Sequence, residues 1–412
     1  MSTNTAVPGG TPKTISKDAE LRNEIKAAVR AAIEAFGDLA INLSHRIHGT
    51  PELGFAEYYS SREVANELRN AGFSVTERAY GLETAISGVA GEGSFKAVVV
   101  AEYDALPELG HACGHNIIAA CAVAAAVGLK SVAAELDLTI EVVGSPAEET
   151  GGGKILMLEQ GAFVEADVAM MVHPAPFEDA SPGFLATSGF SFEFSGKSSH
   201  AAASPWEAAN AADASTLAQV AVGLLRQQLP IETRVHGVVT NAGTAANVIP
   251  GKSGGVYAIR AETLADLQDV APRIEACFTG AAMATGCTVE LEWEYPAYPN
   301  VIQSAQLAAF YQQNAEALGR SFPDEAEARA FRASTDFGAV SQVVPSLHPH
   351  VKICDSPVSN HQSAFTEAAI SERADRALIE GAIAMAWTVV DAALSQASSA
   401  EDTESQPRTS RQ

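Results

Sequence analysis

The sequence contains few cysteines, little basic charge and no clear membrane segment. Its five cysteines are an odd number in 412 residues, and no pair is spaced as CxxC. Neither a disulfide framework nor a structural zinc knuckle is therefore predicted. No early apolar segment resembles a signal peptide, and no run of about 18 apolar residues is evident that could span a bilayer. We expect a cytoplasmic protein without a membrane partner.

The shortage of basic residues excludes further classes. Lys and Arg number 26 against 50 Asp and Glu, a formal net charge of −24. Nucleic acids and anionic membranes reward basic surfaces, so neither is an expected partner. An acidic chain mildly favours cationic ligands such as metal ions, although solubility alone explains many acidic compositions. The length and the 47% hydrophobic content predict two or three domains with ample core.

Buried strands alternate with helices through the first part of the chain. Short apolar runs at 97–101, 138–144 and 168–172 indicate strands, and an Ala-rich helix is predicted at 117–127. This order predicts an α/β domain with a mostly parallel sheet and helices on both faces. Further helices are expected at 18–35, 58–71, 305–318 and 367–394.

The pattern of predicted strands and helices changes after residue 185. The predicted order β-α-β-β-α-β is typical of a ferredoxin-like α+β domain, and we expect it to be inserted at 186–298. The α/β domain would then comprise 19–185 and 299–395, with disordered tails at 1–18 and 396–412. An open sheet edge in the insertion favours pairing with a second copy, so a homodimer is predicted.

The segment HACGHN at 111–116 carries candidate metal ligands. Cys113 and His115 are two residues apart and directly precede the Ala-rich helix. Thiolate and imidazole are ligands that zinc and similar metals select, and a helix N-terminus favours the thiolate. A small buried cysteine beside turn histidines is the alternative, and this short motif alone does not decide between them.

Four more polar residues follow predicted strands: Asp104, Glu148, Glu149 and His173. In parallel sheets, ligands and active-site residues lie at the carboxyl ends of the strands, so these residues are expected at one edge of the sheet. The alternatives are an Asx turn for Asp104 and a solvated acidic pair for Glu148 and Glu149. The glycines of 151–154 do not have phosphate-loop spacing; we expect them to let the backbone pass near the metals.

Eight short motifs stand in a fixed order along the chain. They are EYDALP (102–107), HACGHN (111–116), PAEETGGGK (146–154), VHP (172–174), SHAA (199–202), AANVIPG (245–251), STDFG (334–338) and SNHQSAFTEAA (359–369). This series resembles the M20 family of metal-dependent peptidases and amidohydrolases over roughly residues 40–390. The match is closest to the amidohydrolase subgroup with cysteine in its metal site. Within it, the chain is similar to the branch of Xaa-Arg dipeptidase-like proteins, and p-aminobenzoyl-glutamate hydrolase subunits are near relatives.

The resemblance implies a catalytic α/β domain, a smaller lid that dimerises, and two divalent transition metal ions (Zn, Mn, Co or Ni). The implied metal ligands are Cys113, His115, Glu149, His173 and His361. It also implies that Glu148 is the general base and that Asp104 orients a ligating histidine, here expected to be His115.

The resemblance assigns further roles in the insertion. His200 and Asn247 would hold the scissile carbonyl and its oxyanion, the histidine often crossing to the partner subunit, and Arg260 would take the substrate carboxylate. Without the resemblance, His200 would be read as a solvated loop histidine. Two positions depart from the family pattern. Glu102 stands where two-zinc relatives carry a histidine ligand, so it is not counted as a ligand, and Asn116 replaces an aspartate of many relatives.

The sequence thus predicts a metal-dependent amidohydrolase that cleaves the amide of an N-acyl amino acid or a dipeptide-like small molecule. One alternative is a dipeptidase selective for a basic C-terminal residue, and another is a p-aminobenzoyl-glutamate-type hydrolase. An alternative of another class is a non-catalytic binding protein that retains the fold. The full ligand set together with Glu148 favours the enzyme.

Overall fold

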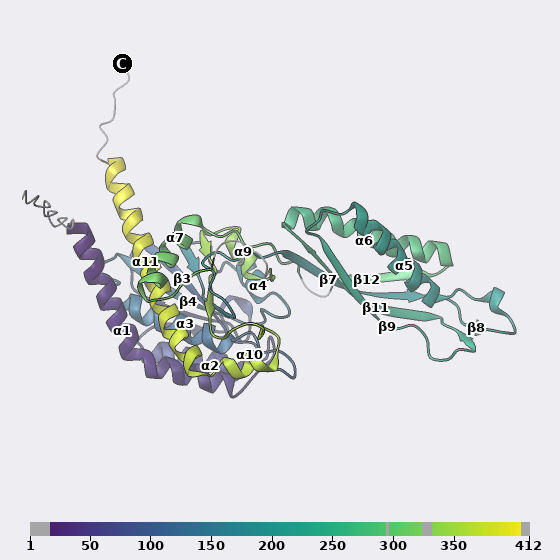
Figure 1. Cartoon of the computed structure of the whole chain (residues 1–412), viewed down its shortest axis with the longest axis horizontal. Helices are drawn as coiled ribbons and strands as arrows, with labels where there is room; N and C mark the ends of the chain where they lie inside the picture. The colour runs from purple at the N-terminus through teal and green to yellow at the C-terminus, as the bar shows by residue number, and fades with distance from the viewer. Residues whose placement is uncertain (1–16, 294–295, 324–331, 405–412) are drawn as a thin grey trace, which may run out of the picture.

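The chain folds into a body and a long part that projects from it (Figure 1). The structure is a computed structural model that describes residues 17–293, 296–323 and 332–404. The predicted tail 1–18 lies almost wholly outside the described residues, and helix α1 (Lys17–His48) already includes its last two positions. The predicted tail 396–412 is wrong in its first part, because helix α11 (Glu372–Glu404) continues to Glu404.

The body is organised around a six-stranded sheet in the order β1-β2-β4-β3-β5-β13. The strand β3 pairs in parallel with β4 and β5, and β13 pairs in parallel with β5. The strands β1 and β2 join the other side as antiparallel neighbours. The α/β prediction is confirmed. The sheet is mixed, because β2, which was not predicted, pairs antiparallel with both β1 and β4. The strands are β1 (Ser74–Glu77), β2 (Ile86–Ala90), β3 (Phe95–Glu102), β4 (Leu138–Ser145), β5 (Val168–Met170) and β13 (Ser346–Leu347).

Helices cover both faces of this sheet. Successive residues of β3 point to opposite faces: Val99 packs in one core cluster with residues of α1, α3 and α11, whereas Val98 packs in another with residues of α4 and α9. Besides α1 and α11, the body helices are α2 (Tyr58–Asn70), α3 (His115–Lys130), α4 (Gly153–Glu159), α7 (Ala305–Ala317), α9 (Phe337–Ser341) and α10 (Ser363–Ala368). The helix predicted at 367–394 is therefore two helices, α10 and α11.

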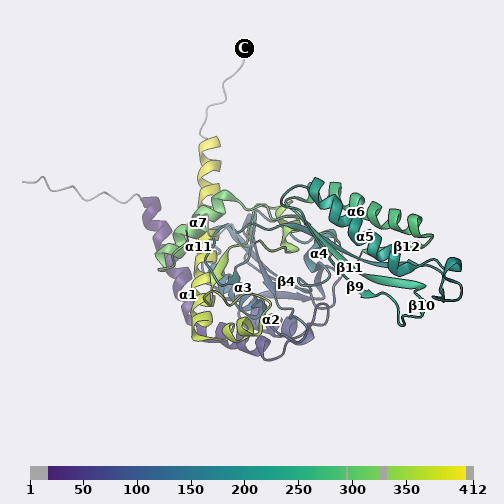
Figure 2. The same ribbon diagram turned by 45° about the vertical axis from the view of Figure 1, so that its right-hand side comes forward.

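The helices α1, α3 and α11 lie against one another in every view (Figures 1 and 2). Small residues allow the close approach: a Cβ on Gly128 of α3 would lie 2.5 Å from Ile33 of α1. The segment Glu372–Ser398 is long and apolar enough to cross a membrane, with a mean hydropathy of 1.6, which the sequence analysis did not recognise. Since 72% of that window is buried inside the protein, it is a core helix here.

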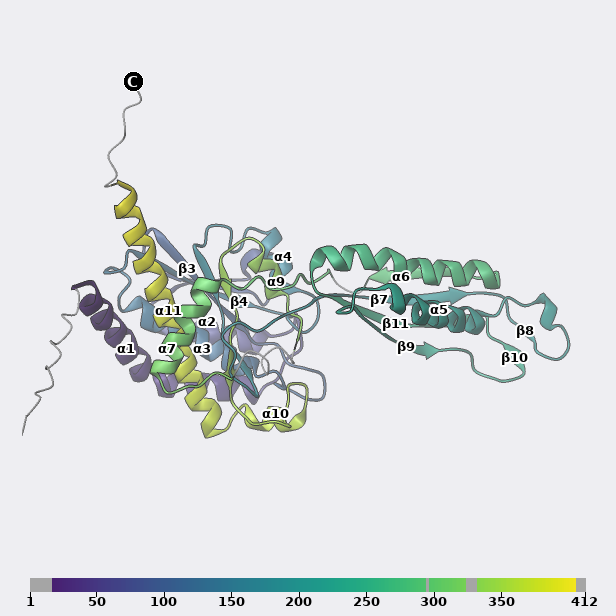
Figure 3. The ribbon, with the colours of Figure 1, turned by 45° about the horizontal axis from the view of Figure 1, so that its top comes forward.

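The projecting part has its own sheet, in the order β12-β7-β11-β9, with every neighbouring pair antiparallel. Helices α5 and α6 lie on one face (Figure 3), and the aromatic rings of Phe190, Phe192, Phe194, Tyr257 and Phe278 form the centre of its core. The element order β-α-β-β-α-β matches the predicted ferredoxin-like pattern. The elements are β7 (Ala186–Ser195), α5 (Ala211–Leu225), β9 (Arg234–Asn241), β11 (Lys252–Ala261), α6 (Leu264–Thr285) and β12 (Thr288–Trp293).

Two small two-stranded ribbons lie outside these sheets. The strands β8 (Ser199–His200) and β10 (Val248–Ile249) pair at the far tip of the projecting part. The strands β6 (His173–Ala175) and β14 (His350–Lys352) pair in the body.

Candidate metal centre

The carboxyl ends of β3, β4 and β5 meet at one edge of the body sheet, because these strands run parallel. Asp104 follows β3, the pair Glu148 and Glu149 follows β4, and His173 opens β6 after β5. Helix α3 begins at His115, beside these ends. Its N-cap, Gly114, has φ +73°, and a Cβ there would lie 2.5 Å from Pro174, so glycine is required for this approach.

The structure places all five predicted metal ligands around a common point. The donor atoms of Cys113, His115 and Glu149 all lie within 4.8 Å of one another. His173 lies beside His115, with 5.8 Å between the ring centroids. His361 approaches from the loop before α10, its Nε2 3.5 Å from Glu149 Oε2. Residues from four separate segments therefore converge on this point.

Asp104 orients two of these ligands. Its Oδ1 lies 3.0 Å from His115 Nδ1, and its Oδ2 accepts a hydrogen bond from Glu149 N at 3.0 Å. His115 Nε2 is thereby turned towards the cluster, the arrangement expected of a carboxylate behind a metal-bound histidine. Burial alone would lower the pKa of His115, but the carboxylates of Asp104 and Glu102 hold it well above its usual value.

The donor set fits a divalent transition metal. His115 Nε2 and Glu149 Oε1 are buried without a hydrogen-bond partner among the described residues, a state that costs free energy unless another group satisfies them. His173 Nδ1 lies 2.8 Å from the Pro174 carbonyl oxygen, which leaves Nε2 for a ligand. Burial and then the nearby His115 lower the pKa of His173 to about 4, so the ring is neutral, as a metal ligand must be.

Cys113 differs from the expectation that a helix N-terminus lowers its pKa. The thiol is only 8% exposed and precedes the cap of α3. Burial and then the Glu149 carboxylate raise its pKa well above the usual value. A bound cation would supply the charge that deprotonates the thiol, so this environment suits a metal ligand and not a free nucleophile.

Glu148 is presented by a constrained turn. Ala147, just before it, has φ +55°, and its amide donates to buried Glu57 Oε1 at 2.8 Å. Tyr298 donates from its hydroxyl to the Glu148 carbonyl oxygen at 3.0 Å. Burial and then the carboxylates of Glu102 and Glu149 raise the pKa of Glu148 well above its usual value. A carboxylate in this setting is a better proton acceptor than one in water.

The glycines after Glu149 do not serve the role that we expected. A Cβ on Gly153 would lie 1.9 Å from the Pro146 carbonyl oxygen, and one on Gly151 would lie 2.4 Å from the Phe55 ring. Both glycines therefore let the loop close on itself and on a neighbouring loop, rather than pass close to the metal ligands.

Sequence reasoning missed a buried ion-pair cluster beside these ligands. Lys154 Nζ lies 2.5 Å from Glu102 Oε1 and 2.6 Å from Asp336 Oδ1. Asp336 belongs to the STDFG motif, which contributed to the family resemblance without an assigned role. The available signal was the presence of Lys154 and Asp336 in the motifs PAEETGGGK and STDFG. Nothing in the sequence indicated that these two residues would meet.

A pocket of about 430 Å³ opens onto the ligand cluster. Its lining includes Glu148 and the ligands Cys113, Glu149, His173 and His361 from the body. The projecting part contributes Arg260 from β11, so the structure brings this predicted substrate-binding residue to the same pocket as the ligands. Other lining residues are Phe184, Thr187, Ala258, Tyr298, Arg332, His348, His350 and Asn360.

His200 and Asn247 are not among the described residues that line this pocket. They lie together at the tip of the projecting part, where Ala201 N donates to the Asn247 carbonyl oxygen at 3.0 Å. The His200 ring is exposed, and its Nδ1 accepts from Ala202 N and Ala203 N. Figure 1 shows β8 at the end of the projecting part that is furthest from the body. Within one chain, the structure does not bring these two residues to the metal ligands.

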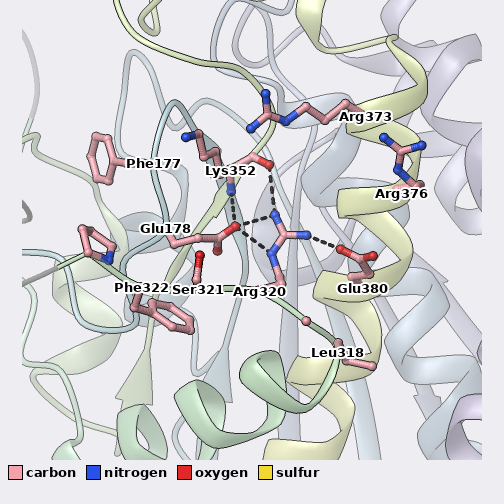
Figure 4. A pocket seen from close by; sticks show the side chains of 12 residues that line it. Phe177, Glu178, Leu318, Arg320, Ser321, Phe322, Lys352, Arg373, Arg376 and Glu380 are labelled. Carbon is pink, nitrogen blue, oxygen red and sulfur yellow. Dashed lines mark hydrogen bonds and ion pairs between the residues drawn. The ribbon is translucent and has the colours of Figure 1, made fainter.

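A different pocket, of about 630 Å³, lies between α11 and the segment after α7 (Figure 4). Its central cation, Arg320, pairs with Glu178 and with Glu380. Arg373 and Lys352 both pair with Asp355. The described lining contains none of the predicted site residues, and its cations Arg320, Arg373 and Lys352 are already paired.

Comparison with known proteins gives the family. The sequence pattern of peptidase family M20/M25/M40 matches residues 98–378. The chain belongs to this family. An Xaa-Arg dipeptidase of Mus musculus is 40% identical over 387 residues, covering 89% of each chain, and one of Homo sapiens is 35% identical over 407 residues, covering 93% of each.

Other M20 relatives are more distant. A p-aminobenzoyl-glutamate hydrolase component of Escherichia coli is 32% identical over 292 residues, which cover 66% of this chain and 61% of that one. Among solved structures, a dinuclear metal-binding M20 peptidase of Bacillus subtilis superposes with a TM-score of 0.68 at 22% identity, covering 87% of this chain and 99% of that one. That likeness confirms the fold. As an M20 protein, the chain is a hydrolase of peptide or amide bonds, so the non-catalytic alternative is set aside.

Proposed function

We propose that this M20 hydrolase is a metal-dependent dipeptidase or N-acyl amino acid amidohydrolase that uses two divalent transition metal ions, Zn, Mn, Co or Ni. The observation that carries this proposal is the meeting of donor atoms of Cys113, His115 and Glu149 within 4.8 Å of one another. His115 Nε2 and Glu149 Oε1 are buried there without a hydrogen-bond partner among the described residues. Thiolate, imidazole and carboxylate together suit these metals better than Mg or Ca.

The site residues would have two kinds of role, as metal ligands or as groups that act on the water and the substrate. Cys113, His115, Glu149, His173 and His361 would hold the ions. When bound, the ions would supply Lewis-acid activation of the attacking water and of the scissile carbonyl. Glu148 would accept the proton of that water on its carboxylate and return it to the leaving amine. Arg260, across the pocket on β11, would bind the carboxylate of the substrate.

For the substrate, we propose dipeptide-like amides with a basic C-terminal residue as the first class to test. The support is the 40% identity to the mouse Xaa-Arg dipeptidase over 89% of both chains. N-acyl amino acids form the second class, and p-aminobenzoyl-glutamate forms the third, on the weaker similarity to the Escherichia coli protein.

We also propose that the chain is a homodimer joined through the projecting part. An apolar stripe on α5 is open to solvent in the single chain, with Leu217, Val220 and Leu224 exposed by 39, 53 and 61%. In the described sheet β9 is an edge strand, with Val238 exposed by 53%. A two-fold pairing would cover both features. A cytoplasmic location stays a prediction, which the five free cysteines support.

The test is a hydrolysis screen on protein stripped with a chelator and reloaded with one metal at a time. We expect amine release from at least one of the three substrate classes, abolished by the chelator and restored by Mn, Zn, Co or Ni. Native mass spectrometry would report the dimer. If the reloaded protein releases no amine from any class, the proposed activity is wrong.

A further inference from the structure

A fully buried cluster of Lys154, Glu102 and Asp336 adjoins the metal centre. Each side chain is at most 1% exposed. Besides the contacts of its ammonium, Lys154 donates from its backbone N to Asp336 Oδ2 at 2.8 Å. Asp336 therefore holds both ends of this residue, the ammonium and the main chain. Lysine is almost never buried completely unless it is paired. The buried position of Lys154 therefore depends on the carboxylates of Glu102 and Asp336.

The cluster holds more negative than positive charge. Glu102, Glu148 and Asp336 offer carboxylate oxygens that all lie within 4.8 Å of one another, and the ammonium of Lys154 lies against two of them. Bringing carboxylates this close inside a protein is costly unless a cation compensates them. Lys154 therefore determines where the Glu102 carboxylate can rest.

Glu102 uses its two oxygens differently. Oε1 contacts Lys154, whereas Oε2 lies 3.6 Å from His115 Nε2. A Glu102 oxygen and the donor nitrogens of His115 and His173 lie within 4.8 Å of one another, the spacing of a metal-ligand set. On sequence grounds Glu102 was not counted as a ligand, because it replaces a histidine of other M20 enzymes. The structure nevertheless directs one of its oxygens at the ligands.

We propose that Lys154 is a positioning residue of the metal centre: held by Asp336, it fixes Glu102 so that Oε2 serves as an additional oxygen ligand beside His115 and His173. This inference rests on the proposed function, since it needs the metal ions. A purely structural ion pair would act otherwise: removing one partner of a buried pair would lower the stability of the metal-free protein, because a buried charge loses its compensation, and would leave the metal affinity of the folded protein unchanged.

The experiment measures metal binding on the full chain. Chelator-stripped wild type, Lys154→Met and Lys154→Arg are titrated with Mn²⁺ and Zn²⁺ against a competing chelator, and bound metal is counted by mass spectrometry. We expect two ions in wild type, and a 10–100-fold weaker affinity for at least one ion in Lys154→Met, the loss typical of groups that support metal ligands. Lys154→Arg should recover part of that affinity, because it restores the cation.

The matched control is Lys96→Met. Lys96 lies at the opposite end of β3 and pairs with Glu141 at 3.0 Å, so this variant loses a partly buried ion pair on the same strand as Glu102. Its metal affinities should equal those of wild type. Thermal unfolding of the metal-free proteins reports stability separately from metal binding.

If Lys154→Met does not fold, the double variant Lys154→Met/Asp336→Asn takes its place, since it removes one charge of each sign. The same loss of affinity is expected, because Glu102 is again without its anchor. Two ions bound with wild-type or higher affinity in whichever variant folds would overturn the inference and leave the proposed function standing. Failure of wild type to bind two ions would instead overturn the proposed function.

Discussion

The two sheets of the molecule differ in the share of their residues that is buried. Along β3 of the body every residue but Lys96 is buried, because helices cover both faces. Along β11 of the projecting part buried residues alternate with more exposed ones, since α5 and α6 cover a single face. The body brings all five predicted metal ligands together within one chain. The projecting part instead leaves the side chains of Leu217, Val220 and Leu224 on α5 exposed in the single chain.

The largest expected effect comes from removing the reacting group of the body. Glu148→Gln should lower kcat by roughly 10²–10⁴, because the amide cannot accept the proton of the attacking water. Metal content and thermal stability should stay near wild type. Steady-state kinetics with metal analysis checks this, with Glu165→Gln, an exposed glutamate near the end of α4, as the control. A near-native kcat would remove Glu148 from the mechanism.

The second prediction concerns the projecting part. His200→Ala should lower kcat by roughly 10²–10³ if His200 supplies an oxyanion donor, although it lies far from the ligands of its own chain. The decisive measurement mixes His200→Ala with Glu148→Gln, both poorly active alone. Activity should partly return, because a hybrid dimer has one site with both native residues.

Native mass spectrometry must show that these hybrid dimers form. If they form and no activity returns, His200 acts within its own chain or has no role. The body and the projecting part would then not share a site across the dimer.

The third prediction returns to the body. Cys113→Ser should weaken metal binding by more than about tenfold, since a neutral hydroxyl would replace the thiolate that we propose as a direct ligand. Cys121→Ser is the matched control, because Cys121 is also buried but lies within α3. Competition titration measures both variants. Equal affinities would make Cys113 a packing residue only.

The smallest effect is on stability and concerns the turn before Glu148. Burial raises the pKa of Glu57 to about 7, so the native state favours the protonated form. Because the pKa of Glu57 is about 4.5 in the unfolded chain and about 7 in the native state, the unfolded chain loses its proton first as pH rises. The free energy of unfolding therefore falls between about pH 4.5 and 7. The free energy of unfolding of Glu57→Gln should therefore rise relative to that of wild type between pH 5 and 8, by up to about 2–3 kcal/mol. Urea unfolding across this range checks it, and a pH-independent difference would contradict it.

Much of the fold follows from local pattern. The Ala-rich helix, the buried strands before Asp104 and Glu148, and the β-α-β-β-α-β order of the insertion all rest on periodicity within short segments, and each appears in the structure. The strand β2 escaped notice because its five residues alternate only weakly and include a glycine. The end of α11 was misplaced because its last turns are polar and read as a tail.

What the sequence by itself determined is the family, the α/β class and the residues competent to bind metal, because motifs and strand ends are properties of neighbouring residues. Only the tertiary structure decided how these residues meet. It brought Lys154 to Glu102 and Asp336, which are 52 and 182 positions away in the chain, and it raised the pKa of Cys113 by burial. It also separated His200 from the ligands of its own chain. Contacts between distant segments and the desolvation of charge depend on packing in three dimensions, which no short stretch of sequence contains.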